Sequence, residues 1–327
     1  MSLDQETGRD RYFEARDREL ELLVDPETGL LARDLAQEVD CPLCGSGVHS
    51  TLFHKQGFTF VRCGSCRLVF VNPQLRESVL LEEYRTAQTA DLWFDVLTSE
   101  RQLELDRAKF AEILDRLEPY RGAGRVLDVG CSIGLFLALA RERGWQGLGL
   151  DVARRAIAYA REHFGLEILE ATLDGAALAP ASFDAVVLLS VLEHATAPRS
   201  MLAECARVLR PGGALYTIVP NVESLACRAL HEGARTFDGR NHLVYFSPST
   251  LADLLDRSGF DVRYLGTRVS SLEPVLQYLA YDQPYGPATT GADPLVRRVR
   301  ERSGDVETMI EQLDLGYKLH CLATRRD

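Results

Sequence analysis

Two pairs of cysteines near the N-terminus have the spacing of a metal site. Each pair has the form Cys-x-x-Cys, with Cys41 and Cys44 in the first pair and Cys63 and Cys66 in the second. Two such pairs can bring four thiolates into a tetrahedron, which suits zinc or, less often, iron. Two disulfides are disfavoured in a reducing compartment, and a redox pair would leave the other pair unexplained. We therefore expect a structural Zn²⁺ held by all four cysteines.

A glycine-containing turn further along the chain predicts a binding site for a small ligand. Residues 125–140 predict a buried strand at Val126–Val129, a turn with Gly130 and Gly134, and a helix with apolar residues at helical spacing. Such a turn brings backbone N–H groups and a helix N-terminus to one point, and glycine lets a ligand approach the main chain closely. Similar turns bind NAD, FAD and ATP, so the turn alone does not identify the ligand.

A carboxylate at the end of the next expected strand indicates a ribose. The strand Gly147–Asp151 places Asp151 at the carboxyl edge of a parallel sheet, where ligands bind. The carboxylate can there accept both hydroxyl hydrogens of a ribose, or it can cap the expected helix Ala153–Phe164. The spacing between Asp128 and Asp151 favours the ribose of an adenosine ligand. A dinucleotide-binding turn would instead have the pattern Gly-x-Gly-x-x-Gly.

Four segments together resemble the class I S-adenosylmethionine-dependent methyltransferases of the small-molecule type. They are the glycine turn, the acidic strand end, a Leu-Glu-His signature at 192–194 and an Arg-Val-Leu-Arg-Pro-Gly-Gly turn at 207–213. They occur in the order and spacing of that family, over roughly residues 117–264. The chain departs from the family at Ser132, where many members have glycine. A serine is compatible with this turn if its φ stays negative.

The resemblance implies which residues surround the cofactor S-adenosylmethionine. Asp151 would hold the ribose, and Ser190 would lie beside the sulfonium. The other contacts would be Asp128, Gly130, Cys131, Ser132 and Gly134 at the methionine part, and Val152, Thr172 and Leu173 at the adenine. A buried cysteine usually behaves as a small apolar residue, so Cys131 is not expected to act as a nucleophile.

Two histidines are candidates for the catalytic step. Methyl transfer depends mainly on positioning and exclusion of water, but an oxygen acceptor must also lose its proton, usually to a histidine or a carboxylate. His194 ends the Leu-Glu-His signature, and His242 begins a segment similar to the family's His-x-x-x-Phe-Ser element. Each could instead be a structural histidine whose ring nitrogens are satisfied by the backbone.

The order of the expected elements predicts an α/β fold. Strands and helices alternate from Val126 to about Tyr264, which indicates a doubly wound, seven-stranded, mostly parallel Rossmann-like sheet. Residues 316–324 would form its antiparallel seventh strand, and residues 9–38 are expected to be helical with a turn at 25–29. The expected divisions are N-terminal helices and a zinc ribbon at 1–77, a helical lid or linker at 78–120, and the methyltransferase domain at 121–327 with an insertion at about 271–315.

Length and charge restrict the partners. A chain of 327 residues with 46% hydrophobic residues can bury one large and one small domain. The 48 acidic and 37 basic residues give a net charge of −11, which opposes binding to nucleic acid. No leader pattern and no apolar run long enough to span a bilayer are found, so we expect a cytoplasmic protein without a membrane partner.

Three functions are open at this point. The favoured one is methyl transfer to a small-molecule acceptor (a metabolite, sugar or natural product), with oxygen as the most frequent acceptor atom. The second is an RNA methyltransferase, because some rRNA-modifying members of the superfamily also carry a zinc ribbon; the acidic charge and the absence of an Asn-Pro-Pro-Tyr-type motif at 190–194 argue against it. The third is a non-catalytic S-adenosylmethionine-binding protein, which the intact Asp128 and Asp151 disfavour. The oligomeric state is not predicted.

Overall fold

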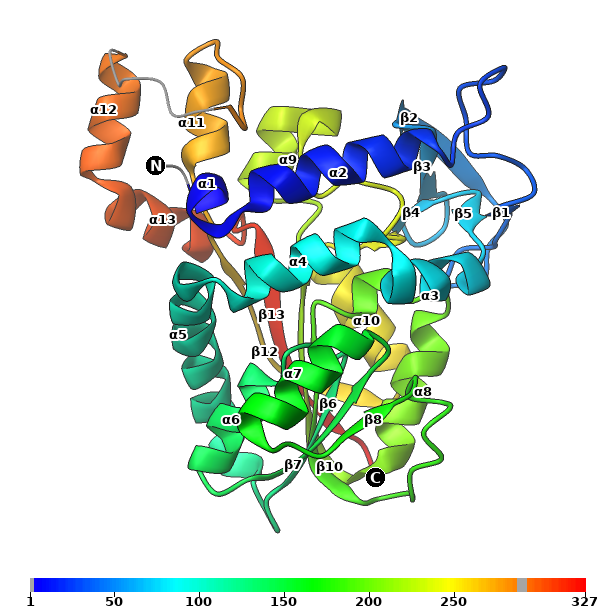
Figure 1. Cartoon of the computed structure of the whole chain (residues 1–327), viewed down its shortest axis with the longest axis vertical. Helices are drawn as coiled ribbons and strands as arrows, with labels where there is room; N and C mark the ends of the chain where they lie inside the picture. Colours follow the sequence, from blue (N-terminus) through cyan, green and yellow to red (C-terminus); the bar gives the residue numbers. More distant parts are fainter. Residues whose placement is uncertain (1–2, 287–292) are drawn as a thin grey trace.

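A twisted seven-stranded sheet forms the centre of the molecule in a computed structural model that describes residues 3–286 and 293–327 (Figure 1). The strand order is β12-β13-β10-β9-β6-β7-β8, and β6 to β10 run parallel. β13 is antiparallel to both of its neighbours, as predicted. The strands are β6 (Arg125–Val129), β7 (Gln146–Asp151), β8 (Ile168–Glu170), β9 (Phe183–Leu189), β10 (Leu209–Pro220), β12 (Phe260–Arg268) and β13 (Lys318–Arg325).

Helices cover both faces of this sheet, which confirms the doubly wound fold. The first face carries α5 (Glu100–Leu117), α6 (Leu135–Glu142) and α7 (Arg154–Phe164), whose apolar side chains share one buried cluster. The second face carries α8 (Pro198–Val208) and α10 (Pro248–Arg257), which belong to another cluster. Ser247 begins α10 with a capping box, because its side chain accepts from the backbone of Thr250.

The cysteine pairs lie before β2 and at the end of β3 of a second, four-stranded sheet, which is at the upper right of Figure 1 and has the order β11-β4-β3-β2. β2 (His49–Lys55), β3 (Phe58–Cys63) and β4 (Val69–Val71) form an antiparallel meander. β11 (Val244–Tyr245) comes from far along the chain, just after His242, and pairs with β4. A short pair, β1 (Ala36–Gln37) and β5 (Gln74–Leu75), flanks this sheet.

The N-terminal helices and those preceding the large sheet lie over the carboxyl ends of the parallel strands. In Figure 1, α2 and α4 cross above the sheet, while the end of β13 lies at the bottom. α2 packs on α4, and α4 also contacts α5 and α7. These covering helices are α1 (Leu3–Thr7), α2 (Arg9–Glu21), α3 (Glu77–Thr86) and α4 (Gln88–Thr98), and η1 (Glu118–Tyr120) follows α5.

The helix predicted over residues 9–38 is wrong beyond Glu21. The Asp25 side chain accepts from the backbone N–H groups of Glu27 (2.8 Å) and Thr28 (3.2 Å), which closes a turn. The chain then pairs antiparallel with Val24 just after α2, and Leu31 N donates to Gly57 O at 2.8 Å in the β2–β3 hairpin. Backbone pairing with Leu23, with Gly57 of the hairpin and with β5 therefore replaces the second half of the expected helix.

The remaining elements extend the second face and the expected insertion. α9 (Leu225–Leu230) and η3 (His231–Gly233) follow β10. The expected insertion contains α11 (Glu273–Leu279), α12 (Pro294–Glu301) and α13 (Ser303–Gln312), and its residues 287–292 lie outside the described residues. Among the helices in the described parts of the chain, none has both the length and the apolar character needed to cross a bilayer.

Candidate functional site

The turn after β6 has the left-handed backbone that a close ligand contact requires. Gly130, Ser132 and Gly134 have φ values of 72°, 50° and 75°. A Cβ on Gly130 would lie 2.6 Å from Val191 Cγ2, so a larger residue does not fit. The expectation that Ser132 keeps a negative φ is wrong. The strain of about 1–3 kcal/mol is offset in part because Ser132 N donates to Asp151 Oδ2 at 2.7 Å.

Asp151 ends β7 and organises the neighbouring main chain. Its Oδ1 accepts from the N–H groups of Val152 (2.7 Å) and Ala153 (2.8 Å), and its Oδ2 accepts from Ser132. The carboxylate has about four acceptor positions, so capacity for a ribose hydroxyl is left. Burial raises the pKa of Asp151, whereas the three N–H donors oppose that shift. Asp151 therefore orients the turn and can still accept from a ligand.

Asp128 supplies a buried acceptor that lacks a donor. The residue is 2% exposed, and its Oδ1 has no hydrogen-bond partner within the described part of the chain. Burial, and then the nearby Asp151, raise the pKa of Asp128 well above its usual range. An unsatisfied buried acceptor costs about 1–3 kcal/mol. The ammonium of a methionine moiety is a suitable donor, so the residues present fit S-adenosylmethionine.

The other residues predicted around the cofactor lie along the same edge of the sheet. Ala171 N donates to Asp151 O at 3.1 Å, which brings Thr172 and Leu173 beside the end of β7. Ser190 follows β9 and is exposed, with a φ of 60°. Burial raises the pKa of the Cys131 thiol, so this residue stays protonated and is a poor nucleophile.

The two predicted histidines meet although they come from distant segments. The centroids of the His194 and His242 rings are 5.0 Å apart. His194 ends η2 (Leu192–His194), and its Nδ1 lies 2.9 Å from Tyr84 Oη of α3. His242 Nδ1 lies 2.9 Å from Thr236 O. Because a carbonyl oxygen only accepts, Nδ1 of a neutral His242 carries the proton and Nε2 keeps its lone pair.

Both imidazoles are neutral at neutral pH. Burial lowers the pKa of His194 to about 4, and the charge of Glu193 opposes this shift. Burial also lowers the pKa of His242, and here Asp238 opposes it. Neutral imidazoles can accept a proton or ligate a cation. Donor atoms of Glu193, His194 and His242 lie within 4.8 Å of one another, a spacing that could also surround a cation.

Glu193 and Lys318 belong to this site, and the sequence reasoning assigned a role to neither. Glu193 is fully buried, and neither of its carboxylate oxygens has a hydrogen-bond partner among the described residues. Lys318 Nζ lies 4.0 Å from Glu193 Oε1 and 3.4 Å from Ser190 Oγ. Lys318 pairs with Pro220 in the antiparallel register of β13 and β10. The expected antiparallel seventh strand could have predicted this, because its first residues must lie at the carboxyl edge of the sheet.

The four cysteines of the ribbon form one cluster. Cys41 Sγ lies 3.4 Å from Cys66 Sγ, and Cys44 Sγ lies 3.5 Å from Cys63 Sγ. All four sulfur atoms lie within 4.8 Å of one another, and the cysteines are not oxidised to disulfides. The nearby His49 is engaged outside this cluster, because its Nε2 contacts Asn72 Nδ2 at 3.0 Å. Four thiolates without a further ligand fit a structural, four-coordinate zinc ion.

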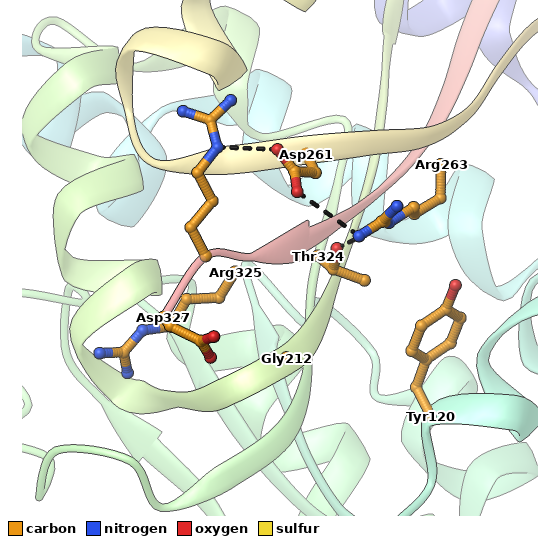
Figure 2. Close-up of a pocket in the computed structure, with 8 residues that line it drawn as sticks. Tyr120, Gly212, Asp261, Arg263, Thr324, Arg325 and Asp327 are labelled. Carbon is orange, nitrogen blue, oxygen red and sulfur yellow. Dashed lines mark hydrogen bonds and ion pairs between the residues drawn. The ribbon is translucent and has the colours of Figure 1, made fainter.

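A cavity of about 680 Å³ lies at the opposite edge of the large sheet (Figure 2). The end of β13 lines it, and β13 runs away from Lys318, so the cavity is remote from the two histidines. Asp261 pairs with two of its arginines: Arg326 Nε lies 2.7 Å from Asp261 Oδ1, and Arg263 Nη2 lies 3.4 Å from Asp261 Oδ2. We therefore do not assign the cofactor to it.

Comparisons with known proteins identify the family. A family model described as a methyltransferase domain matches residues 100–265. A ubiquinone biosynthesis O-methyltransferase of Xanthomonas axonopodis is 30% identical over 218 residues, which cover 60% of this chain and 90% of that relative. The enzyme of the same name from Idiomarina loihiensis is 40% identical over 108 residues, covering 31% of this chain and 44% of that relative.

A solved structure supports the fold. The magnesium protoporphyrin IX methyltransferase of Synechocystis, solved with bound SAH, aligns with a TM-score of 0.51 and 14% identity, over 76% of this chain and all of that one. This alignment supports the methyltransferase fold of the large sheet. The chain belongs to the methyltransferase-domain family and is an S-adenosylmethionine-dependent methyltransferase.

Proposed function

We propose that this enzyme methylates a hydroxyl oxygen of a small-molecule acceptor. The observation that carries the proposal is the pair of neutral histidines beside the carboxyl edge, one of which has its Nε2 lone pair fixed by the bond from Nδ1 to Thr236 O. A neutral amine or an electron-rich carbon can be nucleophilic enough without losing a proton first. A neutral hydroxyl is a weak nucleophile and needs a base to take its proton. The two relatives named above, both called O-methyltransferases, support this choice of acceptor atom.

The residues of the cofactor half, defined as Asp128, the turn 130–134 and Asp151, would hold S-adenosylmethionine. Asp128 Oδ1 would accept from the amino group, and Asp151 would accept from the ribose. Val152, Thr172, Leu173 and Ser190 would complete the contacts at the adenine and the sulfonium. When bound, the cofactor supplies an activated methyl group, whose bond to sulfur breaks as its bond to the acceptor oxygen forms.

The acceptor half, defined as Tyr84, Glu193, His194, His242 and Lys318, would manage the proton and the charge. His242 Nε2 would take the hydroxyl proton, and His194 would lie beside it in a position held by Tyr84. The buried Glu193 carboxylate would stabilise the resulting imidazolium. Lys318 would stabilise negative charge that develops on the acceptor oxygen.

The helices above the site would exclude water from this reaction. Arg240 follows η3 and is 2% exposed, and it joins three covering helices. Its Nη1 lies 2.7 Å from Glu19 Oε2 of α2, and its Nε lies 2.8 Å from Glu83 Oε2 of α3. Its Nη2 donates to Thr89 Oγ1 of α4 at 3.2 Å. These ion pairs hold the cover closed directly beside the acceptor half.

The experiment that tests the proposal is a survey of acceptors with S-adenosylmethionine labelled at the methyl carbon. Catechols, other phenols, sugars, amines and a structured RNA would be compared, and the methylated atom identified by NMR. We expect a methyl ether from at least one hydroxyl compound. Methylation confined to nitrogen, carbon or RNA would contradict the proposal. Reactions from which S-adenosylmethionine is omitted are the control for cofactor-dependent product.

A further inference from the structure

The loop that carries His242 is built into the cysteine ribbon. We define the histidine loop as residues 236–247. One row of the ribbon sheet runs from Arg62, next to the cluster cysteine Cys63, through Val69 to Tyr245 of this loop. Val71 N also donates to Leu243 O at 2.9 Å. The histidine loop therefore forms the outer strand of the sheet that the cysteines close.

Tyr245 connects this row to the backbone of His242. Its phenol donates to His242 O at 2.7 Å and accepts from Gly239 N at 3.3 Å. Tyr245 is 2% exposed, so these bonds are shielded from water. Bonds of this kind fix the direction of the backbone on both sides of Arg240 and hence the position of the imidazole.

Aromatic packing makes a second connection between the ribbon and the loop. Phe60 of β3 lies 5.5 Å from Tyr245 and 5.6 Å from Phe237, measured between ring centroids. Gly239 has a φ of 67°, and a Cβ at this position would lie 2.4 Å from Phe58 Cγ. The loop thus lies directly on the aromatic side chains of β3, with no space between the two at Gly239.

We propose that metal binding by Cys41, Cys44, Cys63 and Cys66 positions His242 for the reaction, so that the ribbon is a working part of the acceptor half. A four-thiolate zinc ion would tie the knuckle before β2 to the knuckle after β3, and structural zinc contributes directly to folding free energy. Without the metal, the two cysteine pairs are no longer joined. β3 and β4 are then held less firmly, and so is β11, which pairs with β4. The significance of His242 rests on the proposed function, but its placement by the metal can be measured without any acceptor.

The test uses hydrogen–deuterium exchange of the full chain with its metal, after chelation, and after zinc is returned. We expect exchange in the histidine loop to rise at least about tenfold on metal loss and to recover with zinc. Peptides from α6 and α7 should change little, and the affinity for S-adenosylhomocysteine (SAH) should stay within about threefold. Unchanged loop exchange in metal-free protein would overturn the proposal.

A second variant keeps the test decisive if the metal-free chain unfolds. Tyr245→Phe retains the four cysteines and the aromatic ring, and removes only the hydroxyl that bonds to His242 O and Gly239 N. We expect full zinc content, about fivefold faster exchange of the histidine loop, and a shift in the NMR signal of the His242 imidazole. Tyr216→Phe is the matched control, because this buried phenol contacts His320 Nδ1 instead. Equal loop exchange in the two variants would refute the role of the row.

The two proposals fail in different ways. If metal loss loosens the histidine loop but His242→Gln leaves turnover intact, the catalytic role of His242 is wrong and the positioning stands. If His242→Gln abolishes turnover but exchange in the histidine loop does not depend on the metal, the catalytic role stands and the positioning is wrong.

Discussion

The cofactor half and the acceptor half lie at the same edge of one sheet, yet they are built differently. The cofactor half comes from one stretch of chain, in which β6, the glycine turn and β7 follow one another. The acceptor half brings together α3, η2, the histidine loop and the first residue of β13. Local hydrogen bonds to Asp151 shape the first, whereas the second depends on packing between distant elements.

Under the proposed function, this difference separates cofactor binding from the chemical step. Asp151 and the turn are held by backbone N–H groups from residues close to them. The acceptor half depends on the ribbon through Tyr245 and on the covering helices through Arg240. Substitutions in one half should therefore leave the other half largely intact, which the following variants examine.

The largest effect is expected from His242→Gln. Removing a general base typically lowers turnover by about 10²–10⁴-fold, and we expect about 10³-fold here. The affinity for SAH, measured by calorimetry, should stay within about twofold because the cofactor half is untouched. His163→Gln, on the exposed face of α7, is the control. Normal turnover in His242→Gln would show that this histidine is structural.

Arg240→Met should destabilise the cover of the acceptor half. Glu19 and Glu83 would then repel each other without a counter-ion, and removing one partner of a buried ion pair costs roughly 3–5 kcal/mol. Urea unfolding would measure this loss in the free energy of unfolding. Adding Glu19→Gln and Glu83→Gln should restore most of it. Arg257→Met, which breaks one exposed pair with Asp253, should cost less than about 1 kcal/mol.

Asp151→Ala tests the opposite half. Loss of a charged acceptor for the ribose should raise the dissociation constant of SAH by about 30-fold, or roughly 2 kcal/mol. Turnover at saturating cofactor should fall by no more than about threefold. Calorimetry and steady-state kinetics give the two values, and Asp253→Ala is the surface control. Unchanged affinity would remove the ribose assignment.

The smallest effect concerns acidic pH. The pKa of His194 is about 4 in the folded chain, below its ordinary value of 6.5, so the unfolded state binds more protons between these values. The free energy of unfolding should therefore fall as the pH drops from 6.5 toward 4, where His194 must be protonated on unfolding. Urea unfolding of His194→Asn should show a shallower pH dependence than that of His163→Asn. Equal slopes would contradict the assignment.

The parts of the fold that depend on short-range pattern were predictable. The glycine turn, the ends of β6 and β7 and the paired cysteines each occupy a few consecutive residues, so type and spacing were sufficient. The expected helix after residue 25 failed because backbone pairing with segments outside it, mainly β5 and the end of α2, outweighs local propensity. The expected negative φ of Ser132 was wrong because the turn geometry requires a positive φ whatever the residue.

The acceptor half was only partly predictable for the same physical reason. His194 and His242 stood in recognisable segments, but nothing near Tyr84 in the sequence indicates that it reaches His194. Lys318 is brought to the site by strand register, and Glu193 becomes important only once burial leaves its oxygens without donors. Such contacts are set by tertiary packing rather than by spacing along the chain.

The contact between Gly239 and the ring of Phe58 has a consequence for how this enzyme can diversify. No side chain can be added to the loop at that point unless the hairpin opposite becomes smaller. Exchange of the ribbon with that of a relative would therefore succeed only if the matching loop were transferred with it. The two segments are therefore expected to change together in evolution, although they are far apart in the sequence. Lys55 and Ala234, which also contact each other, lie 179 residues apart.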